Sequence, residues 1–325
     1  MSKVQTVLGP VSPEELGTTL VHEHCVIGFA GWELDPLYGP PDRQGMISTC
    51  AAALEPAKAL GLCTLIDATP PDLGRDVEFL KTLSDKTQIH IICSTGRYTE
   101  ENGVWPYLKT RAKYGLSDLE TDLYETFMTE ITVGIGTSGV KAGVIKVSTG
   151  LMRIAPCEEA VLRAAARASR ETGAPVITHT EDGTMGPEQA RILTAAGADP
   201  RQIMIGHMCG NQSLAYCRDV LNQGVNIGFD RFGIEIFLPD ETRIATLTAL
   251  LQEGYAERIM LSQDHVGACF GRGGLWPESL LPMVRNWSYD HVLKTILPRL
   301  REMGAATRQT EALMVGNPRR LFGGG

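Results

Sequence analysis

Short apolar segments recur along the 325-residue chain, and amphipathic segments lie between most of them. The apolar segments are rich in valine and isoleucine and alternate little with polar residues, which predicts parallel strands buried on both faces. Eight strands are expected: Thr18–His24, Cys63–Thr69, Ile89–Gly96, Gly143–Ser148, Pro175–Thr180, Ile203–Met208, Asn226–Asp230 and Ile259–Asp264.

The segments between these strands carry helix signals. The clearest lies over Cys157–Glu171, because Pro156 precedes it and Glu158 and Glu159 fall in its first turn, near the positive end of the helix dipole. Other helices are predicted over Met46–Leu60, Ser117–Val133, Gln212–Asn222 and Asp240–Glu253.

Eight strands that alternate with helices fit a closed (β/α)8 barrel, or TIM barrel, in count and length. An open, doubly wound sheet is the alternative, but no Gly-x-Gly-x-x-Gly turn follows the first strand. We found no further repeat and no linker, so a single domain over residues 1–325 is expected. Residues before Thr18 are expected to form a hairpin or lid over the barrel's bottom. Three long segments should form the upper rim: Cys25–Gly45, Arg97–Leu116 and His265–Trp276.

Composition narrows the function classes. The apolar content of 43% and the charged content of 21% are typical of a globular protein with a substantial core. A net charge of -8 argues against nucleic acid as a partner. We found no apolar run long enough to cross a membrane and no signal peptide. The eight cysteines are scattered without a Cys-x-x-Cys pair, so reduced thiols in a cytoplasmic protein are expected.

The first predicted strand ends in His22-Glu23-His24. Residues i and i+2 of a strand share a face, so His22 and His24 point the same way and Glu23 the opposite way. Two neutral imidazoles aimed into one space suit a divalent metal. Cys25 points away by the same alternation and is left out of the ligand set.

Four more polar residues lie toward the downstream ends of later strands: Lys146, His179, His207 and Asp264. That is the face where barrel enzymes build active sites. A lone strand histidine is more often a hydrogen-bonded core residue, and this reading suits His90, which begins a strand, and His291, which lies in the C-terminal helical region. His265 is expected at the rim.

Lys146 needs a separate explanation, because an ammonium cannot bind a metal and is costly in an apolar strand. A snorkelling or ion-paired lysine is one reading. The reading that we favour beside four histidines is a carbamate, formed from the neutral amine and carbon dioxide, whose two oxygens could bridge two cations.

Together, the segments around His22 and His24, Lys146, His179, His207 and Asp264 resemble the phosphotriesterase family of the amidohydrolase superfamily, from Thr6–Pro10 to Gly316–Phe322. The resemblance implies a (β/α)8 barrel, usually a homodimer, that carries two divalent metals. Zinc is placed first, with cobalt, manganese or iron as alternatives. Carried over, His22, His24 and Asp264 would hold the more buried metal, and His179 and His207 the more exposed one. Carboxylated Lys146 and a hydroxide would bridge the pair.

Such a centre implies metal-dependent hydrolysis of an ester-like bond by the bridging hydroxide. Asp264 would accept the proton as attack proceeds. Tyr98 and Arg231 follow the third and seventh strands and are similar to residues of the phosphotriesterase-like lactonases, where a phenol can orient a ring oxygen or the hydroxide and a guanidinium can steady a polar group. An aromatic packed at the mouth and a surface arginine are the plain alternatives. Asp230 is expected to orient His207 or its neighbours.

The chain also departs from that subgroup. Arg97 places a charge beside Tyr98, and the loop at 266–274 is rich in glycine and carries Arg272, which leaves the acyl-chain preference open. Four aromatic residues are expected to line the substrate channel: Phe29, Trp32, Phe270 and Trp276. For Phe29 and Trp32, a dimer interface is the alternative.

The leading hypothesis is a binuclear lactonase acting on acyl-homoserine or other γ- and δ-lactones, hence quorum quenching, with promiscuous phosphotriesterase activity. A dedicated organophosphate triesterase or carboxylesterase is the alternative. A barrel with a structural metal that serves as a scaffold is a third, but closed structural zinc sites have four ligands and no use for a lysine. The expected partner is a small ester or lactone, with neither nucleic acid nor membrane.

Overall fold

The computed structural model describes residues 3–103 and 105–323. Eight parallel strands follow one another around a single sheet in the order of the sequence. They are β3 (Thr18–Glu23), β4 (Leu62–Asp67), β5 (His90–Gly96), β6 (Val144–Thr149), β7 (Val176–Thr180), β8 (Ile203–Ile205), β9 (Asn226–Phe229) and β10 (Ile259–Leu261).

The first and last of these strands meet and close the sheet. The His22 N–H donates to Ser262 Oγ at 3.0 Å, and the Asp264 N–H donates to the His22 carbonyl at 3.1 Å. Beside them, the buried Glu23 carboxyl group accepts a hydrogen bond from the Ser262 hydroxyl at 2.6 Å and others from the backbone of residues 263 and 265. Glu23 thus holds this seam. The predicted barrel is confirmed, and the open sheet is wrong.

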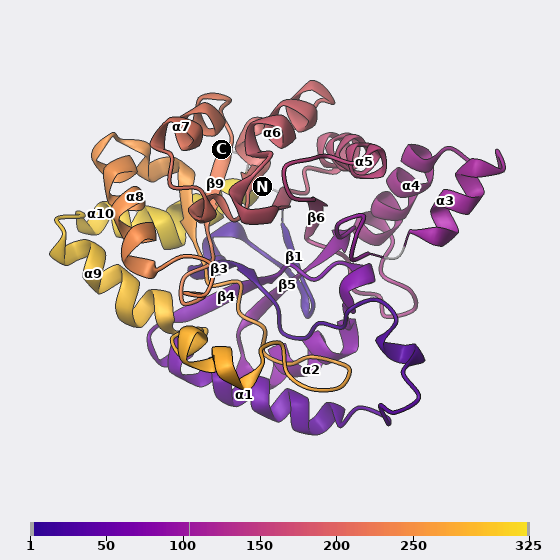
Figure 1. Cartoon of the computed structure of the whole chain (residues 1–325), viewed down its shortest axis with the longest axis horizontal. Helices are drawn as coiled ribbons and strands as arrows, with labels where there is room; N and C mark the ends of the chain where they lie inside the picture. Colours follow the sequence, from indigo (N-terminus) through magenta and orange to yellow (C-terminus); the bar gives the residue numbers. More distant parts are fainter. Residues whose placement is uncertain (1–2, 104, 324–325) are drawn as a thin grey trace.

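Helices surround the strands (Figure 1). The five predicted helices are confirmed as α1 (Arg43–Ala59), α4 (Leu119–Thr132), α5 (Pro156–Thr172), α7 (Leu214–Asn222) and α8 (Asp240–Gln252). Further helices are α2 (Val77–Thr87), α3 (Pro106–Lys113), α6 (Gly186–Ala195), α9 (Leu297–Glu302), α10 (Thr307–Glu311) and α11 (Asn317–Gly323). The expected rim segment 97–116 therefore contains a helix, α3. Within the described residues, no helix combines the length and apolar character that crossing a bilayer requires.

The barrel interior is apolar toward the N-terminal ends of its strands. One layer of side chains comes from seven strands: Val21, Ile66, Ile92, Val144, Ile177, Met204 and Met260. Leu16, Leu321 and Phe322 pack below this layer, together with Val4 of the antiparallel hairpin β1 (Val4–Thr6) and β2 (Gly9–Val11). The predicted N-terminal hairpin is thus confirmed, and it shares the bottom of the barrel with α11. A second apolar cluster packs the helices on the outside of the sheet. Polar side chains occupy the barrel interior at the opposite, C-terminal end of the strands.

Candidate metal centre

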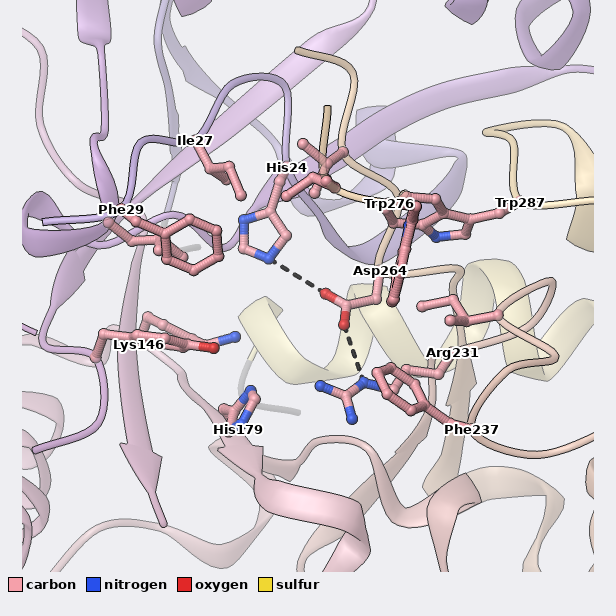
Figure 2. A pocket seen from close by; sticks show the side chains of 15 residues that line it. His24, Ile27, Phe29, Lys146, His179, Arg231, Phe237, Asp264, Trp276 and Trp287 are labelled. Atoms are coloured by element: carbon pink, nitrogen blue, oxygen red, sulfur yellow. Dashed lines mark hydrogen bonds and ion pairs between the residues drawn. The ribbon is translucent and has the colours of Figure 1, made fainter. Parts of the chain in front are cut away.

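The six predicted ligands converge at the C-terminal mouth of the barrel. His22, Lys146 and His179 are buried residues of β3, β6 and β7, and the side chains of His22 and Lys146 are in contact. Figure 2 shows His24, Lys146, His179 and Asp264 pointing into one shared space.

Short distances connect these side chains. Asp264 Oδ1 lies 3.2 Å from His24 Nε2 and 3.7 Å from His22 Nε2, and Asp264 Oδ2 lies 3.7 Å from His207 Nε2. His207 Nε2 is 3.0 Å from His179 Nδ1. Three of the four imidazoles therefore lie close to one carboxylate, and the fourth, that of His179, contacts His207.

Three of the six residues lie just beyond the strands predicted to contain them: His24, His207 and Asp264. β8 ends at Ile205 and β10 at Leu261, and His207 and Asp264 adopt left-handed backbone with φ of 57° and 54°. Such a conformation costs a non-glycine residue about 1–2 kcal/mol. It turns each side chain back over the mouth, and strained backbone of this kind clusters at functional sites.

Burial sets the protonation states of the site. Desolvation lowers the pKa of His22 to about 4 and also lowers the pKa of His179 and His207, so all three imidazoles are neutral at pH 7. Neutral imidazole is the form that binds a metal. Burial alone would raise the pKa of Asp264, but the neighbouring histidines and Arg231 bring it well below its usual value, so this group is a carboxylate.

Lys146 lies inside the cluster. Its side chain is 1% exposed, and its Nζ contacts His22 Nε2. Desolvation lowers the pKa of Lys146 to about 8, although the charge of Asp264 opposes that shift. The amine therefore has an accessible neutral form.

The donor set fits a divalent cation. Ligands about 2.1 Å from a tetrahedral ion are about 3.4 Å apart, close to the separations that Asp264 Oδ1 makes with His22 and His24. His22, His24 and Asp264 indeed form one group of candidate ligand atoms in the described chain. Imidazole nitrogens with a carboxylate suit zinc and neighbouring transition metals.

A second layer of polar groups holds the other nitrogen of each imidazole. Asp230 Oδ2 lies 2.8 Å from His22 Nδ1, and its Oδ1 lies 3.1 Å from His207 Nδ1. Thr69 Oγ1 lies 2.8 Å from His24 Nδ1, and Glu181 Oε2 lies 2.9 Å from His179 Nε2. Partners of this kind fix the tautomer and the ring orientation.

The expectation for Asp230 is confirmed, and it extends to His22. Thr69 and Glu181 were not anticipated from the sequence. Thr69 is the last residue of the second predicted strand, and Glu181 lies two residues after His179, so position alone could have marked both.

A cavity of about 210 Å³ opens beside the cluster. Arg231 Nε donates to Asp264 Oδ2 at 3.0 Å, and the Tyr98 ring packs edge-on against His179 with 5.3 Å between centroids. Burial raises the pKa of the Tyr98 phenol, which stays protonated. Apolar side chains form much of the remaining wall: Ile27, Phe29, Leu73, Ile234, Phe237, Val266, Leu275, Trp276 and Trp287.

Some of the expected channel residues lie elsewhere. Phe29 and Trp276 line the cavity, whereas Trp32 and Phe270 stack on each other at 4.5 Å and are not among its lining residues. Arg272 pairs with Asp35 at 2.6 Å on the surface.

The other residues considered in the sequence analysis do not line the cavity. Arg97 does not line the cavity, His90 begins β5, and His291 bonds to Asp240. His265 packs edge-on against Trp287 and Tyr289 behind the rim.

Comparison with known proteins identifies the family, because the phosphotriesterase family matches residues 2–322. The chain belongs to the phosphotriesterase family. It is 32% identical over 328 residues to a phosphotriesterase homology protein of Mycobacterium tuberculosis, covering 99% of this chain and 98% of that protein. It is 30% identical over 314 residues to an aryldialkylphosphatase of Saccharolobus solfataricus, covering 96% of each. The predicted resemblance is confirmed.

Solved structures agree with this assignment. An organophosphorus hydrolase from Deinococcus radiodurans has a TM-score of 0.95 and 45% identity, covering 98% of this chain and 96% of that one. A structure described as organophosphate hydrolysis engineered from a weak promiscuous lactonase template has a TM-score of 0.95 and 44% identity, covering 99% of this chain and all of that one. As a member of the phosphotriesterase family with a metal-ligand cluster, the chain is a metal-dependent ester hydrolase.

Replacing Asp230 with asparagine should weaken metal binding about 10–100-fold. The two carboxylate oxygens of Asp230 each contact one histidine, His22 or His207, whereas an asparagine amide has only one acceptor oxygen. Competition with a chelator of known affinity measures the change. Asp219→Asn, at an exposed site on α7, is the matched control and should bind metal like the wild type. Unchanged affinity in Asp230→Asn would show that the second layer does not support the ligands.

Proposed function

We propose that this phosphotriesterase family member opens lactones and hydrolyses phosphotriesters as a weaker side activity. The observation that carries the proposal is the placement of a protonated phenol and a guanidinium, Tyr98 and Arg231, beside the histidine cluster in a largely apolar cavity. The similarity of the chain to a structure engineered from a weak promiscuous lactonase supports the same interpretation.

The site is proposed to hold two divalent cations, zinc first, with cobalt, manganese or iron as alternatives. His22, His24 and Asp264 would hold one cation, and His179 and His207 the other, with Lys146 shared between them as a carbamate. When bound, such a pair supplies hydroxide at neutral pH and draws electron density from a carbonyl or phosphoryl oxygen. The burial of Lys146 among the imidazoles supports the carbamate, because an unpaired ammonium there would be costly.

The protein's own groups would then divide the remaining work. The Asp264 carboxylate faces the shared space and can accept a proton from the attacking water. Arg231 Nε donates a hydrogen bond to Asp264 Oδ2 at 3.0 Å and orients the carboxylate for that role. The Tyr98 hydroxyl can donate a hydrogen bond to the ring oxygen of a lactone, and the apolar walls exclude bulk water and favour an acyl substituent.

A dedicated organophosphate triesterase or carboxylesterase is the second candidate. The observation that favours it is the similarity over nearly the full chain to proteins named aryldialkylphosphatase and organophosphorus hydrolase.

The remaining proposals concern assembly and location. We propose a homodimer, and the exposed Leu34 and Leu37 on the segment between β3 and α1 offer apolar surface for it. We also propose a cytoplasmic protein, since all eight cysteines are unpaired thiols. With an acyl-homoserine lactone as substrate, the activity would be quorum quenching.

The direct test compares kcat/KM for a lactone panel and for a paraoxon-type phosphotriester on one preparation, before and after chelation. Both activities should be lost on removal of the metal and restored by zinc or cobalt, with lactones preferred. A higher kcat/KM for the phosphotriester would reverse the order of the two candidates, and activity that survives full metal removal would eliminate both.

Lys146→Ala should lose metal and nearly all activity, because the site loses its bridging group. Short-chain carboxylic acids such as acetate or propionate should restore part of both by filling the space of the missing side chain. The measurements are metal content and hydrolysis rate with and without added acid. Full metal content and rate in Lys146→Ala would exclude the carbamate.

Tyr98→Phe removes only the hydroxyl from the cavity wall. It should lower kcat/KM for lactones about tenfold or more, the loss expected for one hydrogen bond made in the transition state, with a smaller effect on the phosphotriester. Kinetics with both substrates check this. Equal losses on the two substrates would remove Tyr98 from the lactone argument.

A further inference from the structure

A buried ionic network lies behind one wall of the cavity, away from the metal centre. At its centre is the carboxylate of Asp240, the first residue of α8. It accepts hydrogen bonds from the Gly233 N–H at 2.9 Å and from Arg243 Nη1 at 3.1 Å, and its Oδ2 lies 2.7 Å from His291 Nε2. All three side chains are buried.

The network holds the loop of residues 231–239 from behind. The Arg243 guanidinium donates to the carbonyls of Leu238 and, at 3.1 Å, of Ile234. Together with the hydrogen bond that the Gly233 N–H donates to Asp240, these contacts fix the loop backbone at three points. The same loop presents Ile234 and Phe237 to the cavity.

His291 ties this loop to a second wall segment, residues 283–291. The Glu235 N–H donates to the Met283 carbonyl at 3.1 Å. At Gly233, where φ is 88°, a Cβ would lie 2.8 Å from the Asn286 carbonyl oxygen and 2.9 Å from Trp287 Cα. The two segments are therefore in close contact, and the Trp287 side chain lines the cavity.

Figure 2 shows Phe237 and Trp276 on the opposite side of the shared space from Phe29 and Lys146. A substituent that extends from a substrate at the metal centre toward that side would meet the wall that the network holds. The ring of a small lactone, bound beside Tyr98 and His179, would not need to reach it.

We propose that the His291–Asp240 contact positions the cavity wall formed by Ile234, Phe237 and Trp287, and thereby sets which substituents on the substrate are accepted. His291 acts here as a positioning residue, since it is not among the residues that line the cavity. The choice of lactones as probes rests on the proposed function. The contact between the loop of residues 231–239 and the segment 283–291 does not depend on that function.

The test uses His291→Leu, which fills the space without a hydrogen-bond donor, and His291→Gln, whose amide nitrogen can replace Nε2. Asp240 in His291→Leu loses a partner while buried, so the loop should shift. We expect KM for a lactone with a long apolar tail to rise about tenfold, as loss of one such contact predicts, while kcat and KM for the unsubstituted lactone stay within about twofold. His291→Gln should behave like the wild type.

Lys294→Gln is the matched control, because Lys294 lies three residues after His291, is 70% exposed and pairs only with Asp290 among the salt bridges of the described residues. Lys294→Gln should leave kcat and KM unchanged for both lactones. A fall in activity that is equal for both lactones, or no change in their ratio in His291→Leu, overturns the proposal.

A second readout does not depend on the substrate. Acrylamide quenching of tryptophan fluorescence should rise in His291→Leu and return to the wild-type value in His291→Gln, because Trp287 belongs to the affected wall and Trp276 packs edge-on against Phe237 and Trp287. If the wild type opens no lactone, the proposed function fails, and this quenching still decides the inference: equal quenching in the wild type and His291→Leu would overturn it.

Discussion

Four imidazoles, an amine and a carboxylate are withdrawn from water at one end of the barrel, and their desolvation is the constraint on which the site depends. Burial on this scale favours neutral side chains or closely matched partners. Desolvation lowers the pKa of His22, His179 and His207, so these three imidazoles are neutral, the state in which each can offer one nitrogen lone pair to a cation. A divalent metal placed among them would supply the positive charge that Asp264 otherwise takes from Arg231.

The barrel makes this concentration possible because its parallel strands bring all of their C-terminal ends to one mouth. Apolar residues fill the opposite end, so the polar layer does not compete with the core for space. Orientation comes from the next layer outward. Asp230 contacts the imidazoles of both His22 and His207. Thr69 and Glu181 contact the other two. Farther out, the Asp240 network holds the wall that a substrate would touch.

The sequence predicted the parts of this arrangement that follow from periodicity. Runs of valine and isoleucine marked the strands, and alternation along the first predicted strand grouped His22 with His24 as candidate ligands and set Glu23 and Cys25 aside. What the sequence could not predict depends on contacts between distant segments. His207 and Asp264 leave their strands through left-handed backbone that tertiary packing imposes, so the strand ends were placed too far downstream.

The aromatic residues and the outer network illustrate the same limit. Nothing local distinguishes Trp32, which stacks on Phe270 outside the cavity, from Trp276, which lines it. His291 was assigned no role because its partner, Asp240, lies 51 residues away and no motif joins them. Glu23 could be placed on the outer face by alternation, yet its role in closing β3 onto β10 required the three-dimensional structure.

The number of divalent cations bound per chain tests the central claim most directly. The metal-free protein is equilibrated with excess zinc or cobalt, freed of unbound metal and measured by elemental mass spectrometry against protein concentration. The account predicts two cations per chain in the wild type. A value of one or none under these conditions would contradict a pair of cations held by the six side chains at the barrel mouth.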